Sequence, residues 1–293
     1  GDVVGSVYEG HNVKRKDFIL LRMESHPTDD SMMTIAVSKA MLENLEKIRN
    51  KEEGYQEALY DSVVQKMLYY GNKYIHKGYG GRFRAWLKSS THEPYNSYGN
   101  GSAMRVSPAG WVCDNLEDTL EIAKITALPT HNHPEGIKGA QSVAAAIFLL
   151  RTGHDKEYIK NYISENFEYD LDRTLDIIRP NYRFEVSCQK SVPEAFIAFL
   201  EGESYEEVIR GAISIGGDSD TIAAIAGSMA EVIYPIEDKF ITYIKDHLPQ
   251  FTELWDDRLD FYNKIVIPYK IEKGLAEKEL DMTVAQSLRQ GLL

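Results

Sequence analysis

Apolar residues recur at helical spacing along most of this chain, whereas strict alternation of apolar and polar residues is almost absent. The spacing at 33–48 and again at 59–68 is that of amphipathic helices. The same criterion predicts further helices at 116–128, 134–153, 154–167, 191–202, 204–217 and 220–235. RFEVSC at 183–188 is the only strand candidate, and it is short. The sequence therefore predicts an all-α fold.

Residues that start and end helices agree with this prediction. Pro134 and the pair Ser204 and Glu207 resemble helix starts, and Gly153 and Gly202 resemble helix ends. No internal repeat or low-complexity linker divides the 293 residues. We therefore expect a single domain over 1–293, with a motif-bearing core at about 1–235 and a peripheral helical segment at 236–293.

Composition narrows the possible partners and compartments. A formal net charge of −12 argues against non-specific binding to nucleic acid or anionic membrane, which needs clustered lysine and arginine. Cys113 and Cys188 are far apart and match no disulfide framework or zinc pattern. The longest apolar stretch, GAQSVAAAIFLL at 139–150, is too short to span a bilayer, and no secretory leader is evident. We expect a cytoplasmic monomer.

Two adjacent carboxylates follow a proline and a threonine in the stretch PTDDSMMT. Thr28 is a plausible N-cap, which places Asp29 and Asp30 in the first turn of a helix. The helix dipole alone favours acidic residues there by about 0.3–1 kcal/mol, so a structural explanation exists. Two neighbouring carboxylates that face a core nevertheless repel each other unless a cation compensates them.

A second acidic group repeats this arrangement in GGDSDTIAAIAGSMA at 216–230. Asp218, Asp220 and Thr221 precede a helix of small apolar residues, which indicates a buried helix that packs closely against its neighbours. The two groups can share hard cations if they converge. Because the oxygen donors come without histidine or cysteine, they suit Mg²⁺, Mn²⁺ or Ca²⁺ rather than zinc.

Five stretches in order resemble the motifs of the ADP-ribosylglycohydrolase family: GDVVGSVYEG, PTDDSMMT, SYGNGSAMRVSP, THNHPEGIKGA and GGDSDTIAAIAG. The resemblance covers about residues 1–235. It implies an all-helical domain with two divalent cations, Mg²⁺ or Mn²⁺, in a cleft that binds ADP-ribose. It also implies two groups of metal ligands, namely Thr28, Asp29 and Asp30, and Asp218, Asp220 and Thr221.

The resemblance further implies which residues perform the chemistry. Glu9 lies where some relatives carry a catalytic glutamate that contacts the metals, and with Asp29 and Asp220 we count it as catalytic. From the sequence alone, Glu9 is equally compatible with a solvated surface charge. Asp2, in the same motif, is interpreted as a hydrogen-bonding partner of the turn.

Glycine-rich loops are the candidate substrate contacts, because their backbone N–H groups can hold a diphosphate. With the resemblance, these contacts are Gly78, Gly80, Ser97, Tyr98 and Gly99. Tyr98 suits stacking on adenine or ribose, or plain packing. His131 resembles the family histidine beside the ligand, the alternative being a hydrogen bond at a helix entry. Asn100, Arg105 and His133 are interpreted as scaffold.

The implied activity is hydrolysis of an ADP-ribosyl linkage in a protein or in a small ADP-ribose conjugate. Ser31, Ser102 and Ser219 depart from the commonest family spelling but remove no proposed ligand. The bond to arginine, to serine, to another acceptor or in O-acetyl-ADP-ribose stays open. The alternatives are a non-catalytic ADP-ribose-binding protein on the same fold and another metal-dependent hydrolase, such as a helical phosphohydrolase.

Overall fold

The structure is a computed structural model and describes residues 1–273. The chain divides into two compact units, Gly1–Gln250 and Phe251–Leu293. In the first unit the elements are, in order, α1 (Asp2–Gly5), α2 (Asp29–Glu43), α3 (Leu45–Asn50), α4 (Tyr55–Lys73), α5 (Gly81–Leu87), α6 (Gly101–Met104), α7 (Ala109–Val112), α8 (Leu116–Ala127), α9 (Pro134–Arg151), α10 (Lys156–Phe167), α11 (Leu175–Ile178), α12 (Cys188–Glu201), α13 (Tyr205–Ser214), α14 (Ser219–Ile233) and α15 (Asp238–His247).

The second unit is also helical where it is described. The 3₁₀ turn η1 (Pro249–Phe251) leads into it, and α16 (Thr252–Phe261), the π-helical turn η2 (Tyr262–Val266) and α17 (Ile267–Glu272) follow. The predicted peripheral segment at 236–293 is therefore helical over most of its described part. Its last portion, 274–293, lies outside the described residues. The single-domain boundaries stay a prediction.

The predicted helices appear close to their predicted limits, and the capping residues explain where they begin. Thr28 caps α2 by accepting a hydrogen bond from the Asp30 N–H. His133 caps α9 and is followed by Pro134 at the first helical position, and Ser204 caps α13. Each cap satisfies an N–H group that a helix terminus leaves without an intrahelical partner.

The segment predicted as a strand contains no strand. Instead, Ser187 forms an isolated antiparallel bridge with Gly99, and α12 begins at Cys188. The backbone groups of this segment bond to a loop rather than to another strand, because the Asn100 N–H donates to the Val186 carbonyl at 2.7 Å. Residues 1–273 form no β-strand, and the all-α prediction is confirmed for them.

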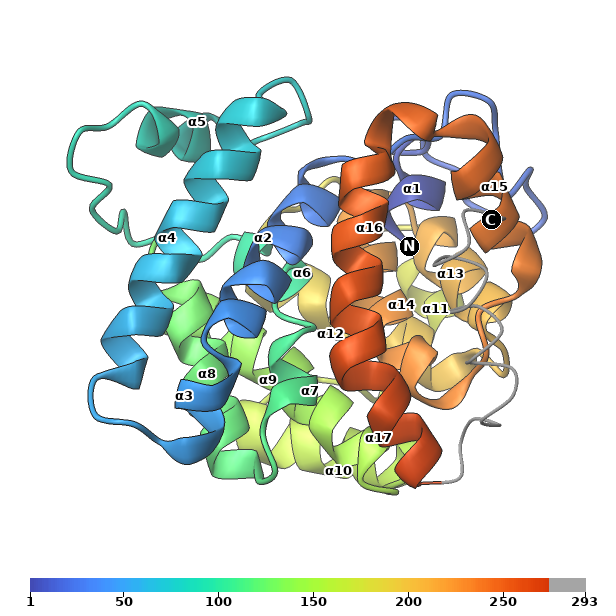
Figure 1. Ribbon diagram of the computed structural model, residues 1–293. Coiled ribbons are helices and arrows are strands. Elements are labelled where there is room, and N and C mark those ends of the chain that lie inside the picture. Colours follow the sequence, from blue (N-terminus) through green and yellow to red (C-terminus); the bar gives the residue numbers. More distant parts are fainter. Residues whose placement is uncertain (274–293) are drawn as a thin grey trace. The chain divides into compact units, whose positions relative to one another are not determined.

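Two helices of small and apolar residues form the centre of the first unit. Val143 to Leu150 of α9 are buried, and α9 packs against α8, α12 and α14 (Figure 1). Helix α14 is buried along most of its length and also packs against α13 and α1. The N-terminal turn therefore lies beside a helix from the far end of the same unit, and this packing assembles the site described below.

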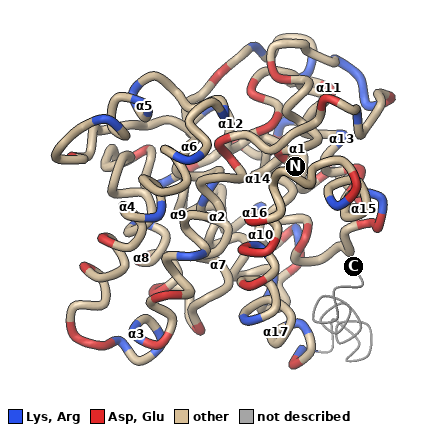
Figure 2. The backbone as a smooth tube through the Cα atoms, turned by 45° about the horizontal axis from the view of Figure 1, so that its top comes forward, with Lys and Arg blue, Asp and Glu red and all other residues tan. Residues whose placement is uncertain are grey.

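Acidic and basic residues both occur throughout the described chain, although α5 carries only arginines and α14 only acidic residues. Figure 2 shows acidic and basic positions interspersed along the tube. Within residues 1–273, no helix is long and apolar enough to cross a membrane. Cys113 and Cys188 are both buried and free, as expected for a chain without a disulfide framework.

Candidate metal centre

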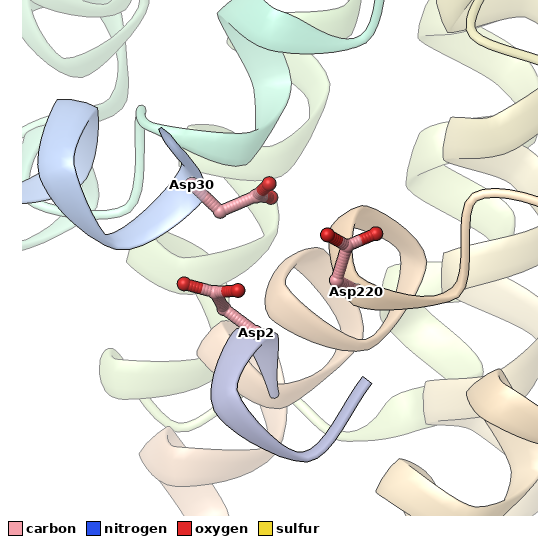
Figure 3. Close-up of side chains that lie close together, drawn as sticks. All are labelled: Asp2, Asp30 and Asp220. Carbon is pink, nitrogen blue, oxygen red and sulfur yellow. The ribbon is translucent and has the colours of Figure 1, made fainter. Parts of the chain in front are cut away.

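Three buried carboxylates converge where α1, α2 and α14 meet. Asp2 lies in α1, Asp30 in the first turn of α2 and Asp220 in the first turn of α14. Their side chains point toward a common point (Figure 3), and one oxygen from each lies within 4.8 Å of the other two. Oxygen atoms at this separation can reach one cation together.

A second carboxylate group adjoins the first and shares Asp220 with it. Glu9, Asp218 and Asp220 each offer one oxygen, and these three oxygens also lie within 4.8 Å of one another. Asp218 and Asp220 are buried, whereas Glu9 is exposed. The fold therefore places two groups of three carboxylates next to each other, and Asp220 belongs to both.

Hydrogen bonds hold some of these oxygens in place. Asp2 accepts hydrogen bonds from the Thr28 N–H at 3.0 Å, from the Thr28 hydroxyl at 2.8 Å and from the N–H and hydroxyl of Ser31. Asp30 accepts from the Thr221 hydroxyl at 3.1 Å, and Asp218 accepts from the Asn100 amide at 2.7 Å. The hydroxyl residues predicted beside the acidic ones thus lie within the cluster.

Other oxygens of the cluster have no partner at all. Asp30 Oδ1 and Asp220 Oδ1 are buried and make no hydrogen bond. Within residues 1–273, no lysine, arginine or histidine forms an ion pair with Asp2, Asp30 or Asp220. Buried carboxylates without a compensating charge are costly, so the free oxygens fit a divalent cation as the missing partner. The donor set, made of carboxylate and hydroxyl oxygens, is typical of sites for Mg²⁺, Mn²⁺ and Ca²⁺.

Burial and mutual repulsion raise the pKa values of these carboxyl groups. Burial raises the pKa of Asp30 well above the ordinary value, and the nearby Asp220 raises it further. Burial also raises the pKa of Asp220 well above the ordinary value, and the nearby Asp218 adds to this shift. Burial, with Asp2 nearby, raises the pKa of Asp29 to about 8. Burial and then Asp218 raise the pKa of Glu9. Without a cation, these carboxyl groups therefore retain their protons to a higher pH than ordinary aspartate and glutamate side chains do.

This arrangement predicts how the stability of the metal-free protein depends on pH. Unfolded aspartates release their protons near pH 4, whereas the folded cluster retains protons to higher pH, about 8 for Asp29. Between these values the folded state binds more protons than the unfolded state, so the free energy of unfolding falls as pH rises. Urea unfolding of the metal-free protein at several pH values in this window checks the sign.

Adding a divalent cation is the matched control for that experiment. Millimolar Mg²⁺ or Mn²⁺ at the alkaline end of the window should restore stability, because a ligand that binds only the folded state stabilises it by mass action. A metal-free protein whose stability stays level or increases with pH across the window would contradict this account of the cluster.

Asp29, predicted as a ligand, belongs to neither group of three in the described chain. Its N–H donates to the Lys77 carbonyl at 2.7 Å, and its Oδ1 faces Gly78. Gly78 has a positive φ of 94°, and a Cβ there would lie 2.9 Å from Asp29 Oδ1. Gly78, a predicted substrate contact, thus adjoins Asp29, and Gly80 caps α5 two residues later. The ligand and catalytic roles of Asp29 stay predictions.

The other predicted substrate residues gather around the loop at 97–101. The Ser97 hydroxyl accepts a hydrogen bond from the Gly99 N–H, and the Tyr98 side chain is 50% exposed. His131 is buried against this loop, and a Cβ at Gly99 would lie 3.6 Å from its Nε2. Because Asn100 donates to Asp218, the loop is joined directly to the carboxylate cluster.

His131 and His133 have different environments. His131 Nδ1 lies 2.7 Å from the Thr130 hydroxyl, and burial, with Arg105 and Arg82 nearby, holds its pKa well below the ordinary value. Its ring is therefore neutral at pH 7. His133 Nδ1 accepts a hydrogen bond from the Glu135 N–H and caps α9, so His133 makes a hydrogen bond at the helix entry.

The sequence analysis missed the contacts that two residues, Asp2 and Asn100, make in the carboxylate cluster. Asp2 forms the expected hydrogen bonds to the turn before α2, but its carboxylate is also one of the three that converge. Asn100, interpreted as scaffold, holds Asp218. Their types and motif positions were visible in the sequence, whereas their contacts depend on how α1, α6 and α14 pack.

Comparison with known proteins identifies the family of this chain. The model of the ADP-ribosylglycohydrolase family matches residues 1–257. The chain belongs to the ADP-ribosylglycohydrolase family. Mouse ADP-ribosylhydrolase ARH3 is 25% identical to it over 313 aligned residues, which cover 81% of each protein. Human ADP-ribosylhydrolase ARH3 is 23% identical, with 81% of this chain and 83% of the human protein covered.

Structural comparison confirms the fold of this ADP-ribosylglycohydrolase. A solved structure of an ADP-ribosylglycohydrolase-related protein complex superposes with a TM-score of 0.66 at 20% identity. The match covers 90% of this chain and 93% of the other. The resemblance inferred from five motifs is thus confirmed, and it extends beyond residue 235. The prediction of an enzyme, a hydrolase of this family, is also confirmed.

Proposed function

We propose that this ADP-ribosylglycohydrolase hydrolyses an ADP-ribosyl glycosidic linkage with the help of two divalent cations, Mg²⁺ or Mn²⁺. The observation that carries the proposal is the pair of carboxylate groups that share Asp220 and contain buried oxygens without partners. Asp2, Asp30 and Asp220 would hold one cation, and Glu9, Asp218 and Asp220 the other. The hydroxyls of Thr28 and Thr221 lie within reach of the first group.

Each part of the site has its own task in the proposed reaction. Divalent cations held by these carboxylates would supply Lewis-acid chemistry, since they would polarise ribose oxygens and lower the pKa of a water molecule. Cleavage at the anomeric carbon develops positive charge on the sugar ring, which nearby carboxylates stabilise. The backbone of the loop at 97–101 and Gly78 would hold the diphosphate, and the half-exposed Tyr98 would contact adenine or ribose. His131, being neutral, would contact the ligand as a hydrogen-bonding group.

The substrate is an ADP-ribosylated protein or a small ADP-ribose conjugate, and the released product is ADP-ribose. The test is to incubate the protein with defined arginine-, serine- and acetyl-linked ADP-ribose, with and without Mg²⁺, and to identify the product. Metal-dependent release of ADP-ribose from one of them supports the proposal. Binding of ADP-ribose without turnover of any linkage, or release of phosphate instead, would replace it with one of the alternatives.

Glu9 is the proposed general acid or base. Its carboxylate lies beside Asp218 and Asp220, it remains exposed, and burial with Asp218 nearby raises its pKa, which is the direction that favours a proton donor. We expect Glu9→Gln to lower kcat by about 10²–10⁴-fold, because a positioned acid or base contributes that much. Single-turnover rates with the reactive linkage check this. A Glu9→Gln enzyme with the turnover of the wild type and full metal binding would remove Glu9 from the mechanism.

A further inference from the structure

A turn of two glycines delivers Asp218 and Asp220 to the metal centre. Gly216 and Gly217 have positive φ values of 72° and 75°, a conformation that other residues adopt only with strain. A Cβ at Gly216 would lie 2.3 Å from Asn12 Oδ1, and one at Gly217 would lie 2.5 Å from the Tyr182 ring. The turn is therefore enclosed by residues from two distant parts of the chain.

Asn12 and Lys14 bind this turn through its backbone. Asn12 Oδ1 accepts a hydrogen bond from the Gly217 N–H at 2.6 Å. Lys14 Nζ donates to the Ile215 carbonyl and, at 2.8 Å, to the Tyr182 carbonyl. These bonds fix the backbone on both sides of Gly216, which is the point where two adjacent glycines leave the chain most free to move.

The same short segment carries Glu9. Asn12 and Lys14 follow Glu9 by three and five positions in the sequence, and the Glu9 carboxylate meets Asp218 and Asp220. Asp218 is held from its other side by Asn100. The segment at 9–14 thus contributes one carboxylate to the second group and, three to five residues later, binds the turn that presents the other two.

The first carboxylate group depends less on this segment. Asp2 and Asp30 are held by hydrogen bonds among α1, α2 and Thr221. Asp220 lies within α14, whose first turn packs against Gly5 of α1. None of these contacts involves Asn12 or Lys14, so loss of either residue leaves the first group supported.

We propose that Asn12 and Lys14 are positioning residues that assemble the Glu9–Asp218–Asp220 group, by tying the segment that carries Glu9 to the glycine turn before α14. The inference rests on the proposed metal centre and adds to it a difference between the two cation sites. One site is built within packed helices, and the other forms only when the segment at 9–14 is joined to the turn.

The test measures Mn²⁺ binding to the full chain and exchange of the Gly217 amide hydrogen. We expect Asn12→Ala and Lys14→Met to weaken one of two Mn²⁺ sites by about 10–100-fold and to leave the other unchanged, as is typical when a group that orients a ligand is removed. In the metal-free protein the Gly217 amide hydrogen should exchange faster in Asn12→Ala. Lys14→Arg, which can still donate to both carbonyls, should restore much of the lost affinity.

Lys16→Met is the matched control, because Lys16 is an exposed lysine two residues after Lys14 whose side chain makes no hydrogen bond or ion pair with the turn within residues 1–273. It should bind Mn²⁺ like the wild type. Equal weakening of both sites, or no change in either, would overturn the inference, as would unchanged exchange at Gly217. Failure of the wild type itself to bind Mn²⁺ would overturn the metal centre, a result distinct from any effect limited to the variants.

Discussion

Asp220→Asn should lose almost all activity while the protein folds normally. Asp220 is the carboxylate common to both groups, so its replacement removes a charged ligand from each proposed cation site. Removal of an outer residue that only orients a ligand already costs about 10–100-fold. We therefore expect a loss of turnover of at least about 10²-fold, measured as ADP-ribose released, together with loss of Mn²⁺ binding.

The same variant should be more stable than the wild type when both are free of metal. Burial and the neighbouring Asp218 raise the pKa of Asp220, so at neutral pH folding must either bury its charge beside Asp218 or take up a proton, and both lower the free energy of unfolding. A neutral amide of nearly the same shape removes that repulsion. Asp172→Asn is the control, because this exposed carboxylate pairs with Lys160 at the surface. An Asp220→Asn protein that retains turnover, or that unfolds more easily without metal, would contradict the assigned role.

Gly5→Ala should destabilise the protein and weaken metal binding together. A Cβ at Gly5 would lie 2.4 Å from the Asp220 Cα and 2.7 Å from the Ser219 carbonyl oxygen. Both contacts are with backbone, so α1 and α14 would have to move apart. Extra volume in a packed site typically costs about 1–3 kcal/mol. The movement would also separate Asp2 from Asp220, which lowers the affinity for cations.

Urea unfolding and Mn²⁺ titration of Gly5→Ala measure both effects. Gly81→Ala is the matched control, because Gly81 lies in the first turn of α5 and nothing lies within 4 Å of its added Cβ. It should be neutral or slightly stabilising, since alanine favours helix over glycine. If Gly5→Ala unfolds at the same urea concentration as Gly81→Ala and binds Mn²⁺ normally, the close contact between α1 and α14 is not what holds the carboxylates together.

Local sequence patterns were sufficient to predict the helices and part of the site. The apolar spacing gave the positions of α2, α4, α8, α9 and α14, because each buries one or more faces against the others. Thr28 was predicted as a cap, and of the aspartates predicted to converge, Asp30, Asp218 and Asp220 belong to the two groups of three and Asp29 does not. These predictions depend on features that lie within a few residues of one another, or on motifs that the family shares.

The rest depends on contacts between distant segments. The segment at 183–188 has the residue types of a strand, but the backbone of Val186 and Cys188 bonds to the loop at 98–100. Asp2 reaches the cluster only because Gly1 and Gly5 let α1 pack directly on α14. No local sequence pattern marks Asn12 or Lys14, since their partners are backbone groups of residues 182, 215 and 217.

The most direct test of the central claim is a crystal structure of the protein grown with Mn²⁺, with the ions located by their anomalous scattering. Our account predicts two peaks, one in contact with Asp2, Asp30 and Asp220 and the other with Glu9, Asp218 and Asp220. A saturated crystal with no anomalous peak among these carboxylates, or with a lysine or arginine paired to them instead, would contradict it.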